Sequence, residues 1–184
     1  MIISGMPAAG KTTLARDLAR RLGVRHYGGG DLLREMALER GYKPSGDAWW
    51  DTEEGMRFLR ERREQLDFDR QADARLLRLV QQASVIITSY TLPWLTKDGI
   101  KFWLKASPVR RARRMAQRDG VTFAQALKIV EQRDRENRRL YAKLYRIRLG
   151  EDLSVFDFVL NTDFLNEADV VDVATVILAR FRPS

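Results

Sequence analysis

The sequence predicts an α/β fold in which helices cover both faces of a parallel sheet. Short apolar runs recur between longer amphipathic stretches, an order typical of alternating strands and helices. A glycine-rich loop separates the first apolar run from the first amphipathic stretch. The run Val85-Ile86-Ile87 is apolar throughout, as expected of a strand that is buried on both faces.

Five strands and seven helices account for most of the chain. The strands are predicted at Met1 to Ser4, Val24 to Tyr27, Val85 to Thr88, Ile100 to Lys105 and Phe156 to Leu160. The helices are predicted at Lys11 to Leu22, Asp31 to Arg40, Thr52 to Arg63, Asp67 to Gln82, Pro108 to Arg118, Thr122 to about Tyr145, and Asn166 to Phe181. This alternation favours one doubly wound parallel sheet.

Two stretches are longer than a simple strand–helix connection requires. About sixty residues separate the second strand from Val85, and about fifty separate Lys105 from Phe156. Helices inserted there can form a cover and a lid over the carboxyl ends of the strands, where ligands bind in open α/β folds. We therefore expect a single domain over residues 1–184, with a covering helical segment at about 30–82 and a lid at about 107–147.

The composition fits a globular protein of one domain, with 184 residues, 45% apolar and 32% charged. The absence of cysteine rules out disulfides and thiolate metal sites and fits a cytoplasmic protein. No apolar run approaches the roughly 18 residues that cross a bilayer, and the polar loop after Met1-Ile2-Ile3 argues against a signal peptide. We expect no membrane partner, and a monomer or small homo-oligomer.

The net charge of +8 has two explanations, a nucleic-acid-binding surface or a site that holds several phosphates. Arginines concentrate in two stretches of helical appearance, Arg110 to Arg114 and Arg133 to Arg139. Solvated helix faces explain many of these charges. The chain has no RGG-like or lysine-rich tail, so nucleic acid is the less favoured partner.

Residues 5–12 fit the phosphate-loop pattern G-x-x-x-x-G-K-[ST], directly after a strand and before a helix. Glycines let the loop turn its N–H groups inward, and the following helix points its positive end at the anion. Lys11 is expected to bridge the β- and γ-phosphates of ATP, and the Thr12 hydroxyl to ligate Mg²⁺. The residues expected to hold the nucleotide are Gly5, Met6, Pro7, Ala8, Ala9, Gly10, Lys11, Thr12 and Thr13.

The rest of the sequence favours a kinase over a hydrolase. The third strand ends in Thr88-Ser89 rather than in the acid that often holds Mg²⁺ and orients water in hydrolases. The single histidine, His26, lies in a predicted strand and is interpreted as structural. A kinase whose acceptor is itself a phosphate needs no strong base, because the attacking oxygen is already ionised; positioning and charge neutralisation suffice.

Beyond the loop, three stretches carry a more specific pattern. They are Gly28 to Ala37, which contains G-G-D-x-x-R-E-M-A, then Trp103 to Ala106, and Phe156 to Thr162. With the loop and the arginine-rich segment, they resemble the archaeal-type cytidylate kinases and, more broadly, the nucleoside monophosphate kinase superfamily. The resemblance covers the chain except Gly41 to Leu66, and it implies the strand order 2-3-1-4-5.

The resemblance also implies residue roles. Arg34 matches the arginine that grips the acceptor phosphate, and Gly30 and Asp31 belong to the same turn. Asp73 and Arg75, in the stretch Asp69 to Arg75, are candidates for binding the pyrimidine and its phosphate. The segment at about 30–82 would thus bind the acceptor.

Lid arginines form the second implied set. Arg118 and Arg133 match arginines that close over the transferred phosphoryl group, and Arg139 lies close to a further one, for which Arg138 is a possible substitute. Guanidinium groups suit this role because they bind phosphate bidentately and keep their charge.

Plainer interpretations stand beside these roles. Arg34 could simply be exposed, and Asp69 to Arg75 could form surface ion pairs along a helix. Arg110 to Arg114 could be a solvated face. Trp49-Trp50 is better explained by packing than by base stacking.

Two departures from the family pattern concern the acceptor site. The arginine that usually ends the third strand, in L-E-G-R, is Tyr90 here, which donates one hydrogen bond but carries no charge. The usual Tyr-Gly-Ile-Asp after the lid helix is Tyr145-Arg146-Ile147-Arg148, so Arg146 and Arg148 are candidates for the missing charge.

The sequence thus predicts Mg²⁺-dependent transfer from ATP to CMP or dCMP, giving ADP and CDP or dCDP. One alternative is a related kinase with another nucleotide or a small metabolite as acceptor, favoured by Tyr90. Another, favoured by the +8 charge, is a nucleotide-dependent RNA-binding or assembly factor.

Overall fold

The computed structural model describes residues 1–46, 49–50, 52–64, 67–82 and 84–181. Five parallel strands form one sheet in the order β2-β3-β1-β4-β5. The strands are β1 (Ile2–Gly5), β2 (Arg25–Gly28), β3 (Val85–Thr88), β4 (Lys101–Lys105) and β5 (Phe158–Asn161). The expected doubly wound sheet and its strand order are confirmed.

The helices agree with the sequence-based ranges to within two residues, with one addition. They are α1 (Lys11–Leu22), α2 (Gly29–Glu39), α3 (Glu53–Glu64), α4 (Asp67–Gln82), α5 (Leu92–Leu95), α6 (Pro108–Asp119), α7 (Phe123–Tyr145) and α8 (Glu167–Arg180). The sequence interpretation did not include α5, which has only 4 residues. The Ser89 side chain starts this turn by accepting hydrogen bonds from the N–H groups of Thr91 and Leu92.

The sheet separates two hydrophobic cores because successive side chains of its strands point to opposite faces. Ile2 and Ile87 pack on one face with α2 and α4. Ile3 and Ile86 pack on the other face with α1 and α8. Burial on both faces explains why β3 is apolar throughout.

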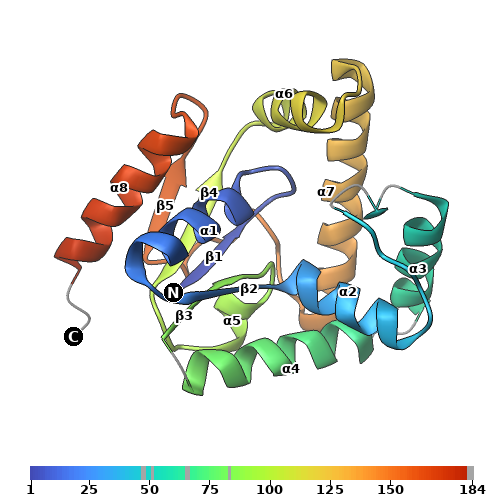
Figure 1. The fold of residues 1–184 in the computed structure, drawn as a ribbon, viewed down its shortest axis with the longest axis horizontal. Coiled ribbons are helices and arrows are strands. Elements are labelled where there is room, and N and C mark those ends of the chain that lie inside the picture. The colour runs from blue at the N-terminus through green and yellow to red at the C-terminus, as the bar shows by residue number, and fades with distance from the viewer. Residues whose placement is uncertain (47–48, 51, 65–66, 83, 182–184) are drawn as a thin grey trace.

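The two long connections place helices beyond the carboxyl ends of the strands (Figure 1). In this view α6 lies above these ends, α7 runs past them with α3 beside it, and α2 and α4 lie below. A reciprocal cap between Thr122 and Gln125 starts α7, and Arg146 ends it in the left-handed conformation, with φ 59°. No helix within the described ranges combines the length and the hydrophobicity that crossing a membrane requires.

Candidate active site

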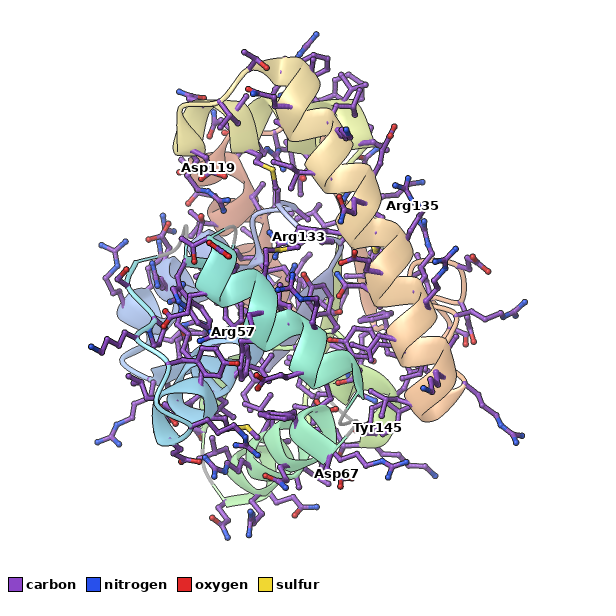
Figure 2. All side chains as sticks on the ribbon, turned by 90° about the vertical axis from the view of Figure 1, so that its right-hand side faces the viewer. Arg57, Asp67, Asp119, Arg133, Arg135 and Tyr145 are labelled. Carbon is purple, nitrogen blue, oxygen red and sulfur yellow. The ribbon has the colours of Figure 1, made fainter. Side chains whose placement is uncertain are left out.

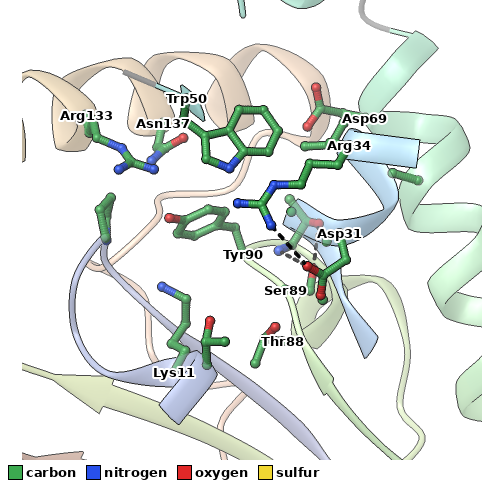
Figure 3. Close-up of a pocket in the computed structure, with 18 of the residues that line it drawn as sticks. Lys11, Asp31, Arg34, Trp50, Asp69, Thr88, Ser89, Tyr90, Arg133 and Asn137 are labelled. Atoms are coloured by element: carbon green, nitrogen blue, oxygen red, sulfur yellow. Dashed lines mark hydrogen bonds and ion pairs between the residues drawn. The ribbon is translucent and has the colours of Figure 1, made fainter. Parts of the chain in front are cut away.

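A cavity of about 360 Å³ opens where the carboxyl ends of β1, β2 and β3 face α2, α3, α4 and α7 (Figure 3). One part, the loop end, is lined by Pro7 and Ala8 of the loop, by Lys11, Thr12 and Thr13 at the start of α1, and by Arg118 and Arg133. The other part, the helical end, is lined by the β2–α2 turn, α2, α3, α4, the residues after β3, and Tyr141. Twelve predicted site residues share this cavity: Pro7, Ala8, Lys11, Thr12, Thr13, Gly30, Asp31, Arg34, Asp73, Tyr90, Arg118 and Arg133.

The predicted loop adopts the conformation that its glycines require. Gly5 has φ 150°, and a Cβ on it would lie 2.5 Å from the carbonyl oxygen of Leu104. Gly10 has φ 94° and immediately precedes α1, whose positive end therefore points at the cavity. The cavity wall does not include four of the predicted loop residues, Gly5, Met6, Ala9 and Gly10. Met6 and Ala9 are buried instead.

Lys11 is folded onto the loop. Its Nζ donates to the carbonyl oxygens of Gly5, at 2.8 Å, and Met6, at 3.0 Å. The same nitrogen lies 4.6 Å from the centre of the Tyr90 ring. Burial lowers the pKa of Lys11, since removal from water disfavours its charged form. An anion at the loop end would therefore meet a poorly solvated ammonium group.

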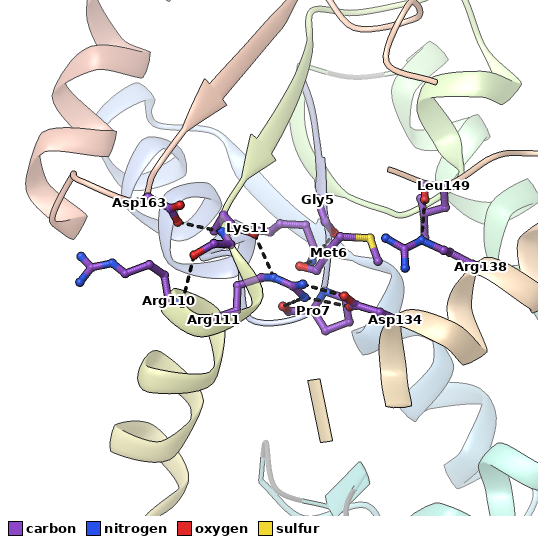
Figure 4. Close-up of polar contacts among 12 residues, drawn as sticks. Gly5, Met6, Pro7, Lys11, Arg110, Arg111, Asp134, Arg138, Leu149 and Asp163 are labelled. Atoms are coloured by element: carbon purple, nitrogen blue, oxygen red, sulfur yellow. Dashed lines mark hydrogen bonds and ion pairs between the residues drawn. The ribbon is translucent and has the colours of Figure 1, made fainter. Parts of the chain in front are cut away.

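The start of α6, in the segment predicted to form the lid, contacts the side of the loop that faces away from the cavity (Figure 4). Arg111 donates from Nη1 to the Pro7 carbonyl oxygen at 3.1 Å, and its two Nη atoms bind the Asp134 carboxylate at 2.8 and 2.6 Å. Arg111 and Asp134 are 2% and 5% exposed. Arg114 donates to the carbonyl oxygen of Ala9 at 3.3 Å. The run Arg110 to Arg114 is therefore not a uniform solvated face: part of it braces the loop.

Ala8 adds an apolar contact between the same two regions. It packs against the small core between α6 and α7, formed by Ala112, Met115, Ala126 and Val130. Its φ of 60° is unusual for a residue other than glycine. Three consecutive loop residues, 7 to 9, thus contact α6 or the small core between α6 and α7.

The arginines predicted to act from a lid divide between two locations. Arg133 and Arg118 line the cavity, and Arg118 also binds Asp119 at 2.6 and 2.8 Å. Arg139 is exposed and does not line the cavity. Arg138 borders a separate hollow behind the loop, where its Nε donates to the Leu149 carbonyl oxygen at 3.4 Å. Neither of the two residues considered for the third lid position therefore faces the cavity.

Arg34 lies at the mouth of the helical end. It donates to the Gly46 carbonyl oxygen at 2.9 Å and lies 3.8 Å from the Asp31 carboxylate. Its guanidinium is 5.7 Å from the centre of the Trp50 ring, and Trp50 lines the cavity. Trp49, by contrast, is buried in the core. The tryptophan pair thus divides into one core residue and one cavity residue.

Asp73 lies deeper in the helical end, at 8% exposure. Its carboxylate accepts hydrogen bonds from Thr91 Oγ1 at 2.6 Å and from the Tyr145 hydroxyl at 2.8 Å. Burial raises the pKa of Asp73 to about 6, although both hydrogen bonds work against this rise. Arg75 does not join it: Arg75 lies outside the cavity, 3.6 Å from the carboxylate of Glu39 on α2.

Arg62 is the cavity residue that the sequence interpretation missed. It comes from α3, inside the stretch Gly41 to Leu66 that the sequence analysis left out of the resemblance, and it is 8% exposed. Its Nε and Nη2 bind the Asp69 carboxylate at 2.7 and 2.5 Å, and Nη2 also donates to the Tyr141 hydroxyl at 3.0 Å. Its position four residues after Phe58 and three after Leu59 places it on the apolar face of α3, a local signal that its exposed neighbours Arg57 and Arg60 lack.

Tyr90 stands between the two ends of the cavity. Its ring centre lies 5.7 Å from that of Tyr141. Burial alone would raise the pKa of the Tyr90 hydroxyl, but the charges of Lys11, Arg133 and Arg62 together lower it. Three cations from three separate elements therefore act on this one hydroxyl.

Comparison with known proteins identifies the family. Residues 2–164 match the Cytidylate kinase-like family. The chain belongs to this family. The cytidylate kinase of Pyrobaculum calidifontis is 33% identical over 94% of this chain and 88% of that protein. The cytidylate kinase of Thermococcus kodakarensis is 30% identical over 99% of this chain and 89% of its own.

Solved structures support the same fold at lower identity. A shikimate kinase from Bacteroides thetaiotaomicron superposes with a TM-score of 0.55 and 20% identity, covering 97% of this chain and 96% of that chain. This likeness shows the P-loop kinase fold alone. Family and fold together establish this member of the cytidylate kinase-like family as a nucleoside monophosphate kinase.

Proposed function

We propose that this enzyme transfers the γ-phosphoryl group of ATP to a pyrimidine nucleoside monophosphate, CMP or dCMP, and releases ADP with CDP or dCDP. The observation that carries the proposal is the single cavity that joins Lys11 to Arg34 and Asp73. A donor at the loop end and an acceptor at the helical end would meet beside Tyr90. The names of the relatives point to the same acceptor.

The loop end suits the triphosphate of ATP. The N–H groups of the loop and the start of α1 would bind the phosphates, and Lys11 would exchange its two carbonyl contacts for phosphate oxygens. Thr12 is exposed beside Lys11 on the cavity wall, and its hydroxyl suits a hard cation such as Mg²⁺. When bound, Mg²⁺ would neutralise charge on the β- and γ-phosphates.

Transfer requires one bond to form and one to break. An oxygen of the acceptor phosphate attacks the γ-phosphorus, while the bond from that phosphorus to the β–γ bridging oxygen breaks and ADP leaves. Arg133 and Arg118 line the cavity at this point and would neutralise the oxygens of the group in transit. Lid closure would exclude water, which otherwise competes as acceptor.

The helical end suits a base that carries an amino group. Asp73 would accept a hydrogen bond from the exocyclic amine of cytosine, a donor that uracil lacks. Arg34 would bind the acceptor phosphate, and Trp50 offers an aromatic face at the mouth.

A panel of acceptors with ATP tests the proposal, with ADP release as the readout. We expect CMP and dCMP to give the highest kcat/KM, and UMP, AMP and GMP to be weaker by about tenfold or more. Turnover that is equal for all nucleotides, or absent with all of them, would contradict it.

One observation favours a second candidate, a kinase that phosphorylates a hydroxyl of a small metabolite. Tyr90 brings no charge, and the Asp31 carboxylate lines the cavity, where it could act as a base towards a hydroxyl group. Adding unphosphorylated polyols and hydroxy acids to the panel distinguishes the candidates. Turnover restricted to these compounds would favour the second.

A further inference from the structure

The point where the acceptor phosphate must arrive contains a neutral residue. In-line transfer brings that phosphate next to the γ-phosphoryl group, and hence next to Lys11. The neutral residue is Tyr90, which follows β3. Its ring centre lies 4.6 Å from the Lys11 nitrogen. A phosphate monoester carries up to two negative charges near neutral pH. Another cation is therefore needed close to Tyr90.

Arg62 is placed to supply it. Its side chain lines the cavity at 10% exposure, and its charge acts on the Tyr90 hydroxyl together with those of Lys11 and Arg133. The Nε and Nη2 atoms of Arg62 already donate hydrogen bonds to the Asp69 carboxylate and the Tyr141 hydroxyl. These contacts join α3 to α4 and α7, and Figure 2 shows α3 and α7 adjacent on the same side of the molecule.

The orientation leaves donors for a ligand. Within the described residues, Nη1 of Arg62 donates to no side chain or carbonyl group, so two N–H groups are left. Asp69 and Tyr141 fix the plane of the guanidinium before any ligand arrives, which reduces the entropy lost on binding. A buried arginine held in this way combines a fixed charge with a fixed direction.

We propose that Arg62 of α3 is a specificity-determining residue that donates from Nη1 to the acceptor phosphate and supplies the charge absent at position 90. The inference rests on the proposed function, because it needs an acceptor that carries a phosphate. It places a substrate contact in α3, within residues 41–66, where the sequence analysis named no site residue.

The test measures acceptor binding apart from folding. Arg62→Met alone would leave the Asp69 carboxylate buried and unpaired, so the main variant is Arg62→Met with Asp69→Asn. We expect its KM for CMP, at saturating ATP, to rise about 100-fold, as for loss of a charge-assisted hydrogen bond. The KM for ATP should stay within about twofold. Arg60→Met, on an exposed face of the same helix, is the matched control and should match wild type.

Cytidine separates phosphate binding from a structural role. It carries no phosphate, so its inhibition constant should be unchanged in the variant while the KM for CMP rises. Equal losses for cytidine and CMP, or an unchanged KM for CMP, would overturn the role of Arg62. Adding Tyr90→Arg to the variant should recover about tenfold in KM, because it returns a cation to the same point. If the wild-type enzyme accepts no nucleoside monophosphate, the proposed function fails first and the role of Arg62 with it.

Discussion

The loop end of the cavity comes largely from one strand, one turn and one helix, whereas the helical end collects side chains from elements far apart in the sequence. Most loop-end residues lie within the short stretch 7–13 of the chain. At the helical end, Arg34 comes from α2, Arg62 from α3 and Asp73 from α4, and Tyr90 follows β3. A short motif can specify the first arrangement. The second depends on how whole helices pack, so it can change acceptor while the donor site is preserved.

The largest expected effect lies at the loop end. Lys11→Ala should lower kcat with CMP at least about 1,000-fold, because it removes the cation next to the transferred group. The variant should melt near the wild-type temperature, since the buried Lys11 ammonium is itself poorly solvated. Steady-state kinetics and a thermal melt check both points. Lys97→Ala, at an exposed lysine, should leave kcat unchanged; substantial turnover by Lys11→Ala would contradict the site.

The contrast between the two ends also explains what the sequence could predict. Alternating apolar runs and the loop pattern depend on neighbouring residues, and they led to the parallel sheet and to Lys11, whereas the observed strand order came from the family resemblance. Arg62 and Arg75 show the limit. Both are arginines on helices near Asp residues, yet Arg62 is buried against α7 and Arg75 faces Glu39. Their roles depend on the orientation of α3 and α4, which helical periodicity alone does not fix.

The bracing contact behind the loop should give the next largest effect. Arg111→Met leaves Asp134 buried without its partner and should cost about 3–5 kcal/mol of unfolding free energy, measured by urea denaturation. Replacing both residues, Arg111→Met with Asp134→Asn, should recover most of that stability, because no unpaired charge is then left.

ATP affinity should not recover in the double variant. The hydrogen bond to the Pro7 carbonyl oxygen is still missing, so the loop is less well positioned and we expect ATP to bind about tenfold more weakly in calorimetry. Arg113→Met, at an exposed position of the same helix, serves as control. Wild-type ATP affinity in the double variant would mean that the Arg111–Asp134 pair stabilises the fold without supporting the loop.

The smallest expected effect is a pH dependence at the helical end, where Asp73 has a pKa raised by burial to about 6 from an ordinary value of 3.8. Between these two pH values the folded enzyme holds a proton on Asp73 that the unfolded chain has released. The contribution of Asp73 to stability is therefore present below pH 3.8 and is lost as pH rises through about 6. Asp73→Asn should remove this part of the pH dependence, measured as urea midpoints across the window.

Ionisation of Asp73 lowers stability as pH rises, but it should improve acceptor binding over the same pH range. Only ionised Asp73 accepts freely from the cytosine amine, so kcat/KM for CMP should rise as pH increases through about 6. The CMP phosphate also titrates at about pH 6, but it does so equally for wild type and Asp73→Asn. The ratio of their kcat/KM values therefore isolates Asp73, and we expect it to increase about tenfold across this range. Asp67→Asn, an exposed change on α4, is the control and should give a constant ratio to wild type. A constant ratio for Asp73→Asn as well would contradict a role of Asp73 in acceptor recognition. Asp73 would then only link α4 to Thr91 and Tyr145.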